Sequence, residues 1–467
     1  MLWACILLPQ LALDGVLRRR ANDDPLVLVD GAVNARTIVA ANASARAAGL
    51  CVGQRLIAAH ALLAQFDVLP CDHQVVDRWQ RFLAAVAYRY SSEVSLLPHA
   101  IVLEVSRSLG LFGPWPAFEN MLRVDFTALG FRHRIALAPT PQAAYVLAGI
   151  LDGSAVLEPA HLRDALQPVP IRKSRLPSAS IDVLSGMGIR TLGQLLKLPR
   201  DGLRRRFGSE LPEAIDRLLG DLPSGLGNYR PPDKFDLRVE LAHEVENIAA
   251  LLFPLRRMTS DLGAYLAGRD GGVQRFVLKL EHRDGWATEL KIGLLSPERD
   301  AGMLFELTRG RLEQVQLPES VLALQLIARD LPSFVPTGRD LFDERPVNAL
   351  PVEQLRERLR ARLGDRAVYR LGSTTDPRPE RAQAITESSA GYHEPHPRPT
   401  WLLDRPIPLR GPMPRILAGP ERLETGWWDG AEACRDYYVI ETSLGQHAWA
   451  FCQPGEQIGW MLQGWFA

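Results

Sequence analysis

The stretch SSEVSLLPHAIVLEVSRSLGLFG, residues 91–113, decides the fold of this chain. Two apolar runs, 94–97 and 101–105, flank Pro98 and His99, and a proline with a polar neighbour between two apolar runs is typical of a tight turn between strands. This pattern predicts a β-hairpin. The surrounding pattern predicts a first strand at 3–8, helices over 77–90, 116–129 and 141–151, and a strand at 131–137. The order β-α-β-β-α-β indicates a ferredoxin-like domain.

Composition bounds the class of protein. The 467 residues are enough for about three to four domains. Lys and Arg number 54, as do Asp and Glu, so the zero net charge argues against a protein wrapped in nucleic acid over its whole surface, although local basic patches remain open. The five cysteines form no CxxC and have no histidine at ligand spacing, so we expect no metal site and no disulfides, as in a reducing cytoplasm. No apolar run reaches the ~20 residues of a membrane span.

The hairpin resembles the central palm hairpin of the Y-family (translesion) DNA polymerases. Those enzymes carry an Asp-Glu pair at the turn, where this chain has Pro98-His99, and an LDV-type run on the returning strand, where this chain has Leu103-Glu104-Val105. Their first strand carries a catalytic Asp, and laid over MLWACILLPQ that position falls on Ala4. The resemblance therefore implies a palm whose catalytic positions, Ala4, Pro98 and His99, hold no metal ligand. We predict no catalytic residue, no metal and no cofactor.

Residues 1–165 are interpreted as this palm, with a fingers subdomain inserted at about 22–72. Strands at 26–29 and 37–40 precede helices at 43–48 and 56–63, which resembles the family's fingers. A Tyr and an Arg of the first fingers helix hold the incoming triphosphate in that family. Here Ala43 takes the Tyr position, Ala47 takes the position of a following Lys, and Arg46 is kept. Arg46 is a candidate nucleotide ligand, with a solvated helix-face arginine as the alternative.

Residues 166–232 resemble the family's thumb, which contains a helix-hairpin-helix. Residues 161–232 contain 12 Arg and Lys but only 7 Asp and Glu, a local excess of positive charge. Ser178-Ala179-Ser180 stands where the family has a Gly-x-Gly turn that approaches a DNA phosphate, while the second half, 188–193, is intact. The candidate DNA-binding residues are Arg190, Arg204, Arg205 and Arg206. A solvated helix face is the alternative for the last three.

Residues 235–332 resemble the little-finger domain of the same family. The expected order is a strand at 237–241, a helix at 248–266, strands at 273–281 and 288–293, a helix at 300–314 and a strand at 321–328. Alternation within 274–280 predicts a sheet with one wet face, to which Arg275 and Lys279 point together with Glu281. Arg275 and Lys279 are candidate DNA-binding residues.

Residues 333–399 are expected to be a linker that contains FVPTGRDLFDE. Its core resembles the peptide by which bacterial polymerases bind the sliding clamp, with Gly338 in place of the usual Gln, so Asp340, Leu341 and Phe342 are the clamp-binding candidates. A rival, Gln354-Leu355, lies inside a helical pattern at 352–363. Residues 373–399, rich in Pro, Ser, Arg and Glu, are expected to form a flexible tether.

Residues 400–467 hold six of the ten tryptophans and predict a small β module, with strands at 436–441, 447–452 and 460–465. Most of these aromatics are expected in its core. Exposed examples, such as Trp427-Trp428 or Trp465-Phe466, would suit a docking surface.

The fold class expected is an α+β multidomain, Y-family polymerase-like right hand with a ferredoxin-like palm, fingers, a helical thumb, a little finger and a C-terminal β module. Over its whole length, including GPERLETGWWDG at 419–430, the chain resembles a catalytically inactive branch of the Y family found in bacterial mutagenesis cassettes.

This resemblance implies a cytoplasmic, non-catalytic adaptor that joins the nucleoid during DNA damage and serves SOS-type DNA repair by mutagenic translesion synthesis. Its implied partners are the sliding clamp (β subunit), an error-prone replicative-type polymerase, a RecA-like companion and primed or damaged DNA, with no membrane. Two alternatives remain: an active, divergent translesion polymerase, and a clamp-independent DNA-binding factor.

Overall fold

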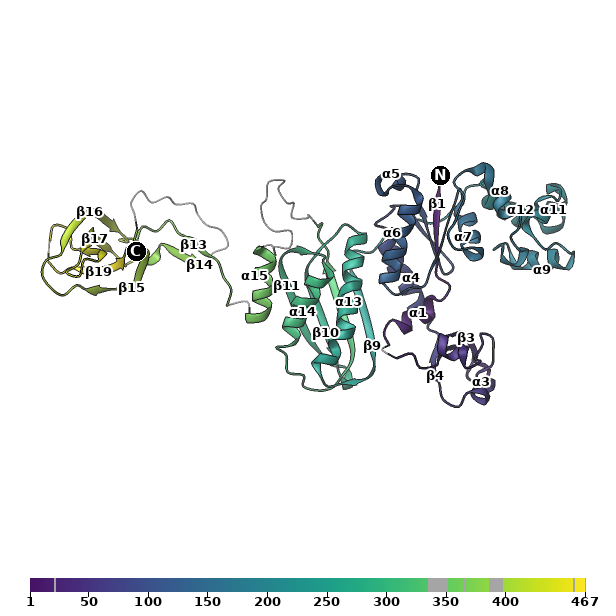
Figure 1. Ribbon diagram of the computed structural model, residues 1–467, viewed down its shortest axis with the longest axis horizontal. Coiled ribbons are helices and arrows are strands. Elements are labelled where there is room, and N and C mark those ends of the chain that lie inside the picture. Colours follow the sequence, from purple (N-terminus) through teal and green to yellow (C-terminus); the bar gives the residue numbers. More distant parts are fainter. Residues whose placement is uncertain (21, 335–351, 365–366, 386–397, 457, 467) are drawn as a thin grey trace. The chain divides into compact units, whose positions relative to one another are not determined.

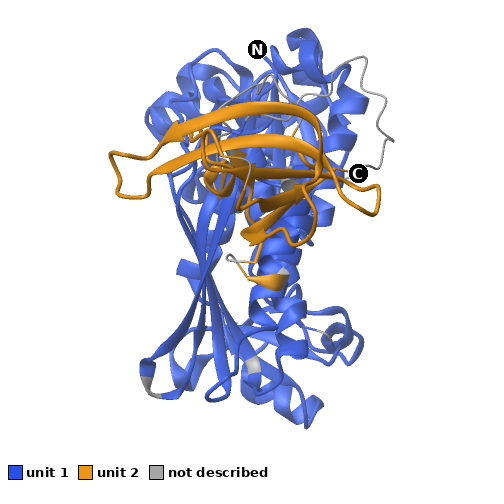
Figure 2. Cartoon of the chain, turned by 90° about the vertical axis from the view of Figure 1, so that its left-hand side faces the viewer, with its two compact units in different colours: residues 1–362 blue, residues 363–467 orange. Residues whose placement is uncertain are grey.

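The computed structural model describes residues 1–20, 22–334, 352–364, 367–385, 398–456 and 458–466. The chain forms two compact units, residues 1–362 and 363–467, which Figure 2 colours separately. The first unit holds the segments predicted as palm, fingers, thumb and little finger. The second begins inside the segment predicted as a linker.

The palm is built on a five-stranded sheet in the order β5-β6-β1-β7-β8. Its strands are β1 (Trp3–Leu7), β5 (Val94–Leu97), β6 (Ala100–Glu104), β7 (Arg134–Ala138) and β8 (Ser154–Ala155). β1 pairs antiparallel with both β6 and β7, and β6 pairs antiparallel with β5. This is the strand order of a ferredoxin-like domain, and the prediction is confirmed.

Helices cover both faces of the palm sheet. They are α1 (Leu11–Leu17), α4 (His73–Ala87), α5 (Ser108–Phe112), α6 (Trp115–Ala128) and α7 (Pro141–Ile150). α4 and α6 share a core with Ala4 and Ile6 of β1, whereas α7 packs with Cys5 and Leu7 on the opposite face. A strand buried on both faces reads as a continuous apolar run, which is why residues 4–8 carry no polar side chain.

The decisive hairpin forms as predicted. Leu97 and Ala100 are the last pair of the β5–β6 ladder, so Pro98 and His99 make a two-residue turn. His99 has φ +54°, a left-handed conformation that is uncommon for a residue with a side chain. Two hydrogen bonds hold the turn, because Leu8 N donates to the His99 carbonyl (2.8 Å) and the Tyr145 hydroxyl donates to the Pro98 carbonyl (2.7 Å).

The fingers are a small three-stranded sheet in the order β3-β2-β4 with its own core. The elements are β2 (Leu26–Asp30), β3 (Thr37–Ala41), α2 (Ala43–Ala47), α3 (Leu56–Leu62) and β4 (Asp67–Pro70). The first four were predicted, and β4, which pairs parallel to β2, was not. The Asn42 side chain accepts hydrogen bonds from Ala45 N at the start of α2 and from Leu26 N at the start of β2.

The thumb consists of short helices that share a core with α7. They are α8 (Leu162–Leu166), α9 (Ser178–Gly186), α10 (Leu192–Leu196), α11 (Arg200–Phe207) and α12 (Glu210–Leu219). Ser178-Ala179-Ser180, which stands where the family has its Gly-x-Gly turn, forms the first turn of α9. The connection between α9 and α10 passes through Gly188 at φ +86°, and Thr191 and Gln194 then form a capping box.

The little finger is a four-stranded antiparallel sheet in the order β11-β10-β12-β9. Its elements are β9 (Phe235–Val245), α13 (Ile248–Gly268), β10 (Val273–Glu281), β11 (Ala287–Glu298), α14 (Ala301–Leu312) and β12 (Val321–Asp330). α13 and α14 lie side by side over one face (Figure 1), and the other face is open, as predicted. The predicted helix at 352–363 is α15 (Val352–Leu363), whose Ala361 is buried in the same core.

Within this unit the little finger packs on the palm through α13 and α4. At Gly268 a Cβ atom would lie 2.0 Å from the Ala85 carbonyl oxygen, so only glycine permits this approach of the two helices. Nearby, Arg18 at the end of α1 donates two hydrogen bonds, of 2.6 and 2.9 Å, to the carboxylate of Asp261 on α13. Both side chains are 1% exposed.

The second unit is a five-stranded antiparallel sheet in the order β15-β19-β18-β17-β16 with a small hairpin beside it. Its strands are β13 (Leu371–Ser373), β14 (Gln383–Ile385), β15 (Trp401–Pro408), β16 (Arg415–Thr425), β17 (Ala433–Glu441), β18 (His447–Cys452) and β19 (Met461–Trp465). The predicted β module is confirmed, with two strands, β15 and β16, beyond those expected.

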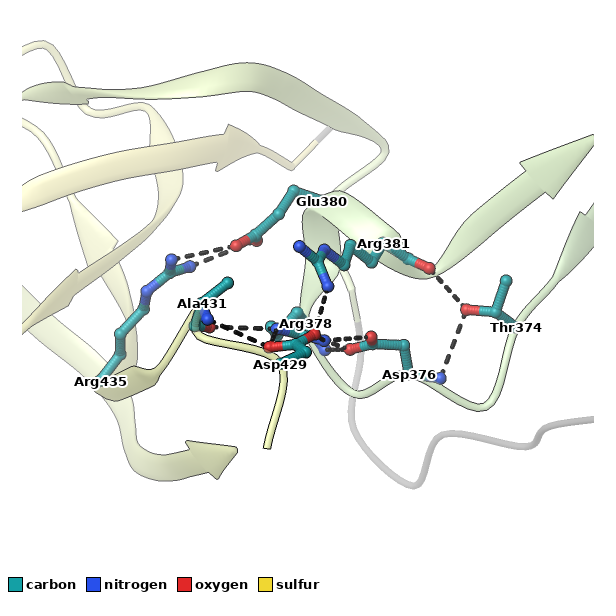
Figure 3. Close-up of polar contacts among 8 residues, drawn as sticks. All are labelled: Thr374, Asp376, Arg378, Glu380, Arg381, Asp429, Ala431 and Arg435. Atoms are coloured by element: carbon teal, nitrogen blue, oxygen red, sulfur yellow. Dashed lines mark hydrogen bonds and ion pairs between the residues drawn. The ribbon is translucent and has the colours of Figure 1, made fainter. Parts of the chain in front are cut away.

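The expected flexible tether is wrong over residues 373–385. β13 and β14 pair, and a 3₁₀ turn at Pro379–Arg381 joins the module through ion pairs (Figure 3). Arg378, 2% exposed, binds the carboxylates of Asp376 (2.6 Å) and Asp429 (2.7 Å) and the Ala431 carbonyl (3.0 Å). These pairs tie the hairpin to the turn before β17. Residues 386–397 of the predicted tether lie outside the described residues.

In the described part of the chain, none of the helices combines the length and the apolar character needed to cross a bilayer.

Candidate functional site

A pocket of about 410 Å³ opens beside the palm turn. The end of β1, the start of α1, the fingers strands β2 and β3 and the first turn of α4 line it together with Pro98 and His99. This is where the resemblance places the catalytic centre of a polymerase. Its walls are largely apolar, and the polar side chains that line it are Gln10, Asp30, Cys71, His73, His99 and Arg175.

The strand register corrects one predicted position. Ala4 pairs with Leu103, three residues along β1 from the turn and therefore roughly 10 Å from it. Ala4 is also fully buried against α4 and α6, on the face away from the thumb. The β1 residue beside the turn is Leu7, which pairs with Ala100 and lines the pocket. The position corresponding to the first-strand carboxylate is thus Leu7, and it too lacks an oxygen ligand.

Few carboxylates lie near enough to the turn to bind a metal ion there. Of the described residues that line the pocket, Asp30 is the one with a carboxylate, and both of its oxygens have partners. Its Oδ1 accepts a hydrogen bond from Gly31 N (2.7 Å), and its Oδ2 lies 3.0 Å from His73 Nε2. The Gly31 bond, followed by His73, holds the pKa of Asp30 below its usual range. Glu104 lies at the far end of β6, opposite Trp3, four residues from Ala100 and therefore roughly 13 Å from the turn.

These residues do not fit the pair of Mg²⁺ ions that polymerase chemistry uses. Two ions about 3.5–4 Å apart need several shared oxygen ligands. Leu7, Pro98 and His99 supply none from their side chains, and within the described residues no group of three or more His, Cys, Asp and Glu side chains is arranged to hold a metal.

Arg46 lies outside this pocket. It is exposed on α2, and its Nε donates a long hydrogen bond of 3.4 Å to the Asn42 carbonyl in the same helix. The pocket instead has Arg175, whose guanidinium carbon lies 4.5 Å above the ring of Tyr145. Tyr145 in turn holds the Pro98 carbonyl, so Arg175 supports the turn from the start of the thumb.

A second candidate site is the open face of the little-finger sheet. Arg275 and Lys279 of β10 both lie on this face, as predicted, but they differ in their surroundings. Lys279 forms a 2.6 Å ion pair with Glu289, whereas Arg275 has no carboxylate partner in the described part of the chain. Lys279 is therefore partly neutralised, and Arg275 is the stronger candidate for a phosphate contact.

The sheet adds two cations to this face that the sequence analysis missed. Lys291 on β11 lies opposite Val277, between Arg275 and Lys279, and Arg329 lies near the end of β12. Both are exposed, and among the described residues neither has an ion-pair partner. Hydrogen bonding by Lys279, with weaker effects of Lys291 and Arg329, holds the pKa of Glu289 below its usual range, which places these cations around one carboxylate.

The thumb candidates are all exposed. Arg204, Arg205 and Arg206 follow one another on α11, and Arg190 lies in the turn before α10. The backbone N–H of Arg190 donates to the Gln194 side chain (2.6 Å), so its side chain and not its backbone is available to a phosphate. The clamp candidates Asp340, Leu341 and Phe342 lie outside the described residues.

A protein family model and a named relative match this chain. Residues 14–149 match the model of the impB/mucB/samB family. Over 462 residues the chain is 26% identical to Protein ImuB from two strains of Caulobacter vibrioides, and the alignment covers 90% of this chain and 100% of the relative. The resemblance predicted from the sequence is confirmed by these matches.

Among solved structures, the chain is similar to Y-family DNA polymerases. A Dbh–Dpo4 polymerase chimera shares 14% identity at a TM-score of 0.41, covering 70% of this chain and 98% of that one. DinB from Sulfolobus solfataricus shares 13% identity at a TM-score of 0.39, covering 72% of this chain and 100% of that one.

Proposed function

We propose that this protein is a non-catalytic, polymerase-like adaptor in damage-induced mutagenic translesion synthesis. It holds primed or damaged DNA along the thumb and little finger and binds the sliding clamp through Asp340, Leu341 and Phe342. It brings an error-prone replicative-type polymerase and a RecA-like companion to the same place.

One observation carries this proposal: the palm hairpin is retained while the residues at its metal-binding positions are Leu7, Pro98 and His99. Two-metal phosphoryl transfer needs carboxylates there to activate the primer hydroxyl and to stabilise the leaving oxygens. A palm with an intact sheet and an apolar pocket in place of that site supports a binding role rather than a chemical one.

The basic surfaces support a retained DNA contact. Arg275, Lys291 and Arg329 on the little finger and Arg204, Arg205 and Arg206 on the thumb are exposed. Phosphate contacts of this kind give affinity without reading sequence, as an adaptor at many lesions requires.

The second unit supports partner docking. Trp427 and Trp428, 76% and 61% exposed, contact each other edge to face, with ring centroids 5.6 Å apart, between β16 and β17. Aromatic side chains dominate the energetic centres of protein interfaces, and two adjacent exposed tryptophans are otherwise costly in water.

Clamp binding tests the adaptor role directly. In the full chain, Leu341→Ala with Phe342→Ala is expected to abolish binding to the purified sliding clamp and leave the affinity for primed DNA within about twofold, because the two side chains fill an apolar pocket and contribute no charge. The matched control is Gln354→Ala with Leu355→Ala, which removes the rival motif and is expected to leave clamp binding unchanged.

Clamp binding that survives the first double variant contradicts the motif assignment. A wild-type chain that binds primed DNA and never binds the clamp supports the clamp-independent alternative instead.

A further inference from the structure

A second pocket, of about 350 Å³, lies on the other side of α4 from the palm turn, where α4 meets β9 and α13. We call it the α4–β9 pocket. Its aromatic residues are Trp79 and Phe82 of α4, Tyr229 and Phe235 before and at the start of β9, and Tyr265 of α13. Its charged residues are Arg19, Asp72, Arg78, Arg81, Lys234, Asp236, Arg238 and Glu240.

The carboxylates of this pocket are engaged elsewhere. Asp72 caps α4 by accepting hydrogen bonds from Gln74 N and Val75 N, and Asp236 accepts one from the Gln325 side chain (2.7 Å). Glu240 pairs with Arg238, which also binds Glu281. Each of the three keeps its negative charge, but within the described residues none forms an ion pair with Arg19, Arg78 or Lys234.

Three cations of the pocket remain without a carboxylate. Arg81 pairs with Asp77 at 2.8 Å, but within the described residues Arg19, Arg78 and Lys234 have no ion-pair partner. Arg78 and Lys234 are exposed at the rim. The pocket is lined by five cationic and three anionic side chains, and these three cations are the ones open to an anionic ligand.

Arg19 is the least satisfied of the three. Its Nε is buried without a hydrogen-bond partner, and its guanidinium carbon lies 5.1 Å above the ring of Trp79. Burial, and then the neighbouring positive charge of Arg18, lowers its pKa to about 10. Arg18 itself is neutralised by Asp261. Asp261 and Glu240 oppose this shift from beyond ion-pair distance, so within the described residues the guanidinium has no carboxylate in direct contact to offset its desolvation.

We propose that the α4–β9 pocket binds a nucleoside phosphate, with the base against the aromatic residues and the phosphate among Arg19, Arg78 and Lys234. Its volume lies in the range of small-molecule sites. Aromatic rings stack on bases of any identity, and guanidinium groups match phosphate oxygens. The site is distinct from the pocket beside the palm turn, and the proposal does not depend on the proposed function.

The test is isothermal titration of the full chain with dAMP, dATP, the tetranucleotide dT4 and inorganic pyrophosphate. dAMP and dATP are expected to bind saturably. The double variant Arg78→Gln with Lys234→Gln is expected to bind them roughly tenfold or more weakly, because two charge-assisted contacts are lost at exposed positions that do not bear on folding. Arg19→Gln is expected to weaken binding further.

Two controls locate the site. Arg107→Gln with Arg163→Gln removes the same charge from exposed positions outside the pocket and is expected to leave the affinity unchanged. Arg46→Gln is expected to do the same. Loss of nucleotide binding in Arg46→Gln, with affinity kept in Arg78→Gln/Lys234→Gln, would place the nucleotide in the fingers and overturn the proposal.

The titrations with dT4 and pyrophosphate identify the ligand of the site. If dT4 displaces bound dAMP, the ligand is a nucleotide within a single strand, and if dT4 binds without displacing dAMP, the ligand is a free nucleotide. Either result supports the site. Pyrophosphate that binds as tightly as dATP overturns it, because the base would then contribute nothing. Absence of saturable binding by dAMP and dATP overturns it as well.

Discussion

Arg18 at the end of α1 and Asp261 on α13 form an ion pair between the palm and the little finger. Their ion pair is bidentate, with distances of 2.6 and 2.9 Å, and almost completely buried. An ion pair in such a place is weak evidence of net stabilisation, since desolvation offsets its attraction, but removal of one partner leaves an uncompensated buried charge.

Arg18→Met is therefore expected to destabilise the first unit by about 3–5 kcal/mol, measured as a shift of its urea unfolding transition in the full chain. Arg89→Gln is the matched control, because the Arg89 side chain is 49% exposed and its 3.3 Å pair with Asp125 is expected to contribute about 1 kcal/mol or less. The double variant Arg18→Met/Asp261→Leu should recover most of the loss. A double variant as unstable as Arg18→Met alone would show that packing, and not the buried charge, is responsible.

Asp429 makes the second unit sensitive to acid. A hydrogen bond from Arg378 is the main cause that holds its pKa below the usual range, and Arg378 lowers the pKa of Asp376 in the same way (Figure 3). The unfolded chain then takes up protons at a higher pH than the folded unit does. The stability from these carboxylates is present above about pH 4 and is lost as the pH falls through their lower, folded pKa values.

The acid response is measured by tryptophan fluorescence of the full chain, because this unit holds six tryptophans. The wild-type transition is expected to fall to lower denaturant concentration below about pH 4, and Arg378→Gln should show a smaller dependence on pH in that window. Arg415→Gln, which removes an exposed pair with Glu441, should keep the wild-type dependence. Equal pH dependence in wild type and Arg378→Gln would refute this role of Arg378.

At the scale of elements, the hairpin at 94–104 shows how far local sequence patterns reach. Apolar runs around Pro98 and His99 predicted both strands and the turn, because turn chemistry and strand propensity are local. The β1 residue expected beside that turn was Ala4, but the strand register places Leu7 there. Register is set by pairing between strands about 95 residues apart in sequence, and a run that is apolar on both faces contains no alternation to fix it.

The open face of the little finger likewise has features that a local sequence pattern predicts and features that depend on strand pairing. Alternation along β10 predicted that Arg275 and Lys279 share the wet face, whereas Lys291 and Arg329 join them only through the sheet order β11-β10-β12. Lys279 also forms an ion pair with Glu289 on the neighbouring strand, which no local sequence pattern predicts.

This face yields a test of DNA binding. Replacing Arg275, Lys291 and Arg329 by Gln is expected to reduce the slope of log K against log salt for primed DNA by up to about 3, since each phosphate contact contributes about 0.9. Arg309→Gln with Arg311→Gln removes charge from α14, on the covered side of the sheet, and should leave the slope unchanged. An unchanged slope in the triple variant would remove this face from the DNA contact.

At the scale of the whole molecule, the sequence predicted the palm, fingers, thumb and little finger and most of their elements. The helix at 352–363 and the strands at 273–281 and 447–452 have the predicted bounds. β16 was missed because most of its residues are exposed, so neither face shows a hydrophobic pattern. The hairpin at 371–385 was missed because its polar composition is stabilised by ion pairs with residues some fifty positions away, such as Arg378 with Asp429.

We propose that the whole molecule keeps a polymerase scaffold without polymerase chemistry. Primer extension by the purified full chain tests this, with a primed template, all four deoxynucleoside triphosphates and either Mg²⁺ or Mn²⁺. We expect primers of unchanged length with both metals, because the side chains of Leu7, Pro98 and His99 supply no oxygen ligand for the ions. Templated extension that co-purifies with the chain through successive columns would contradict it.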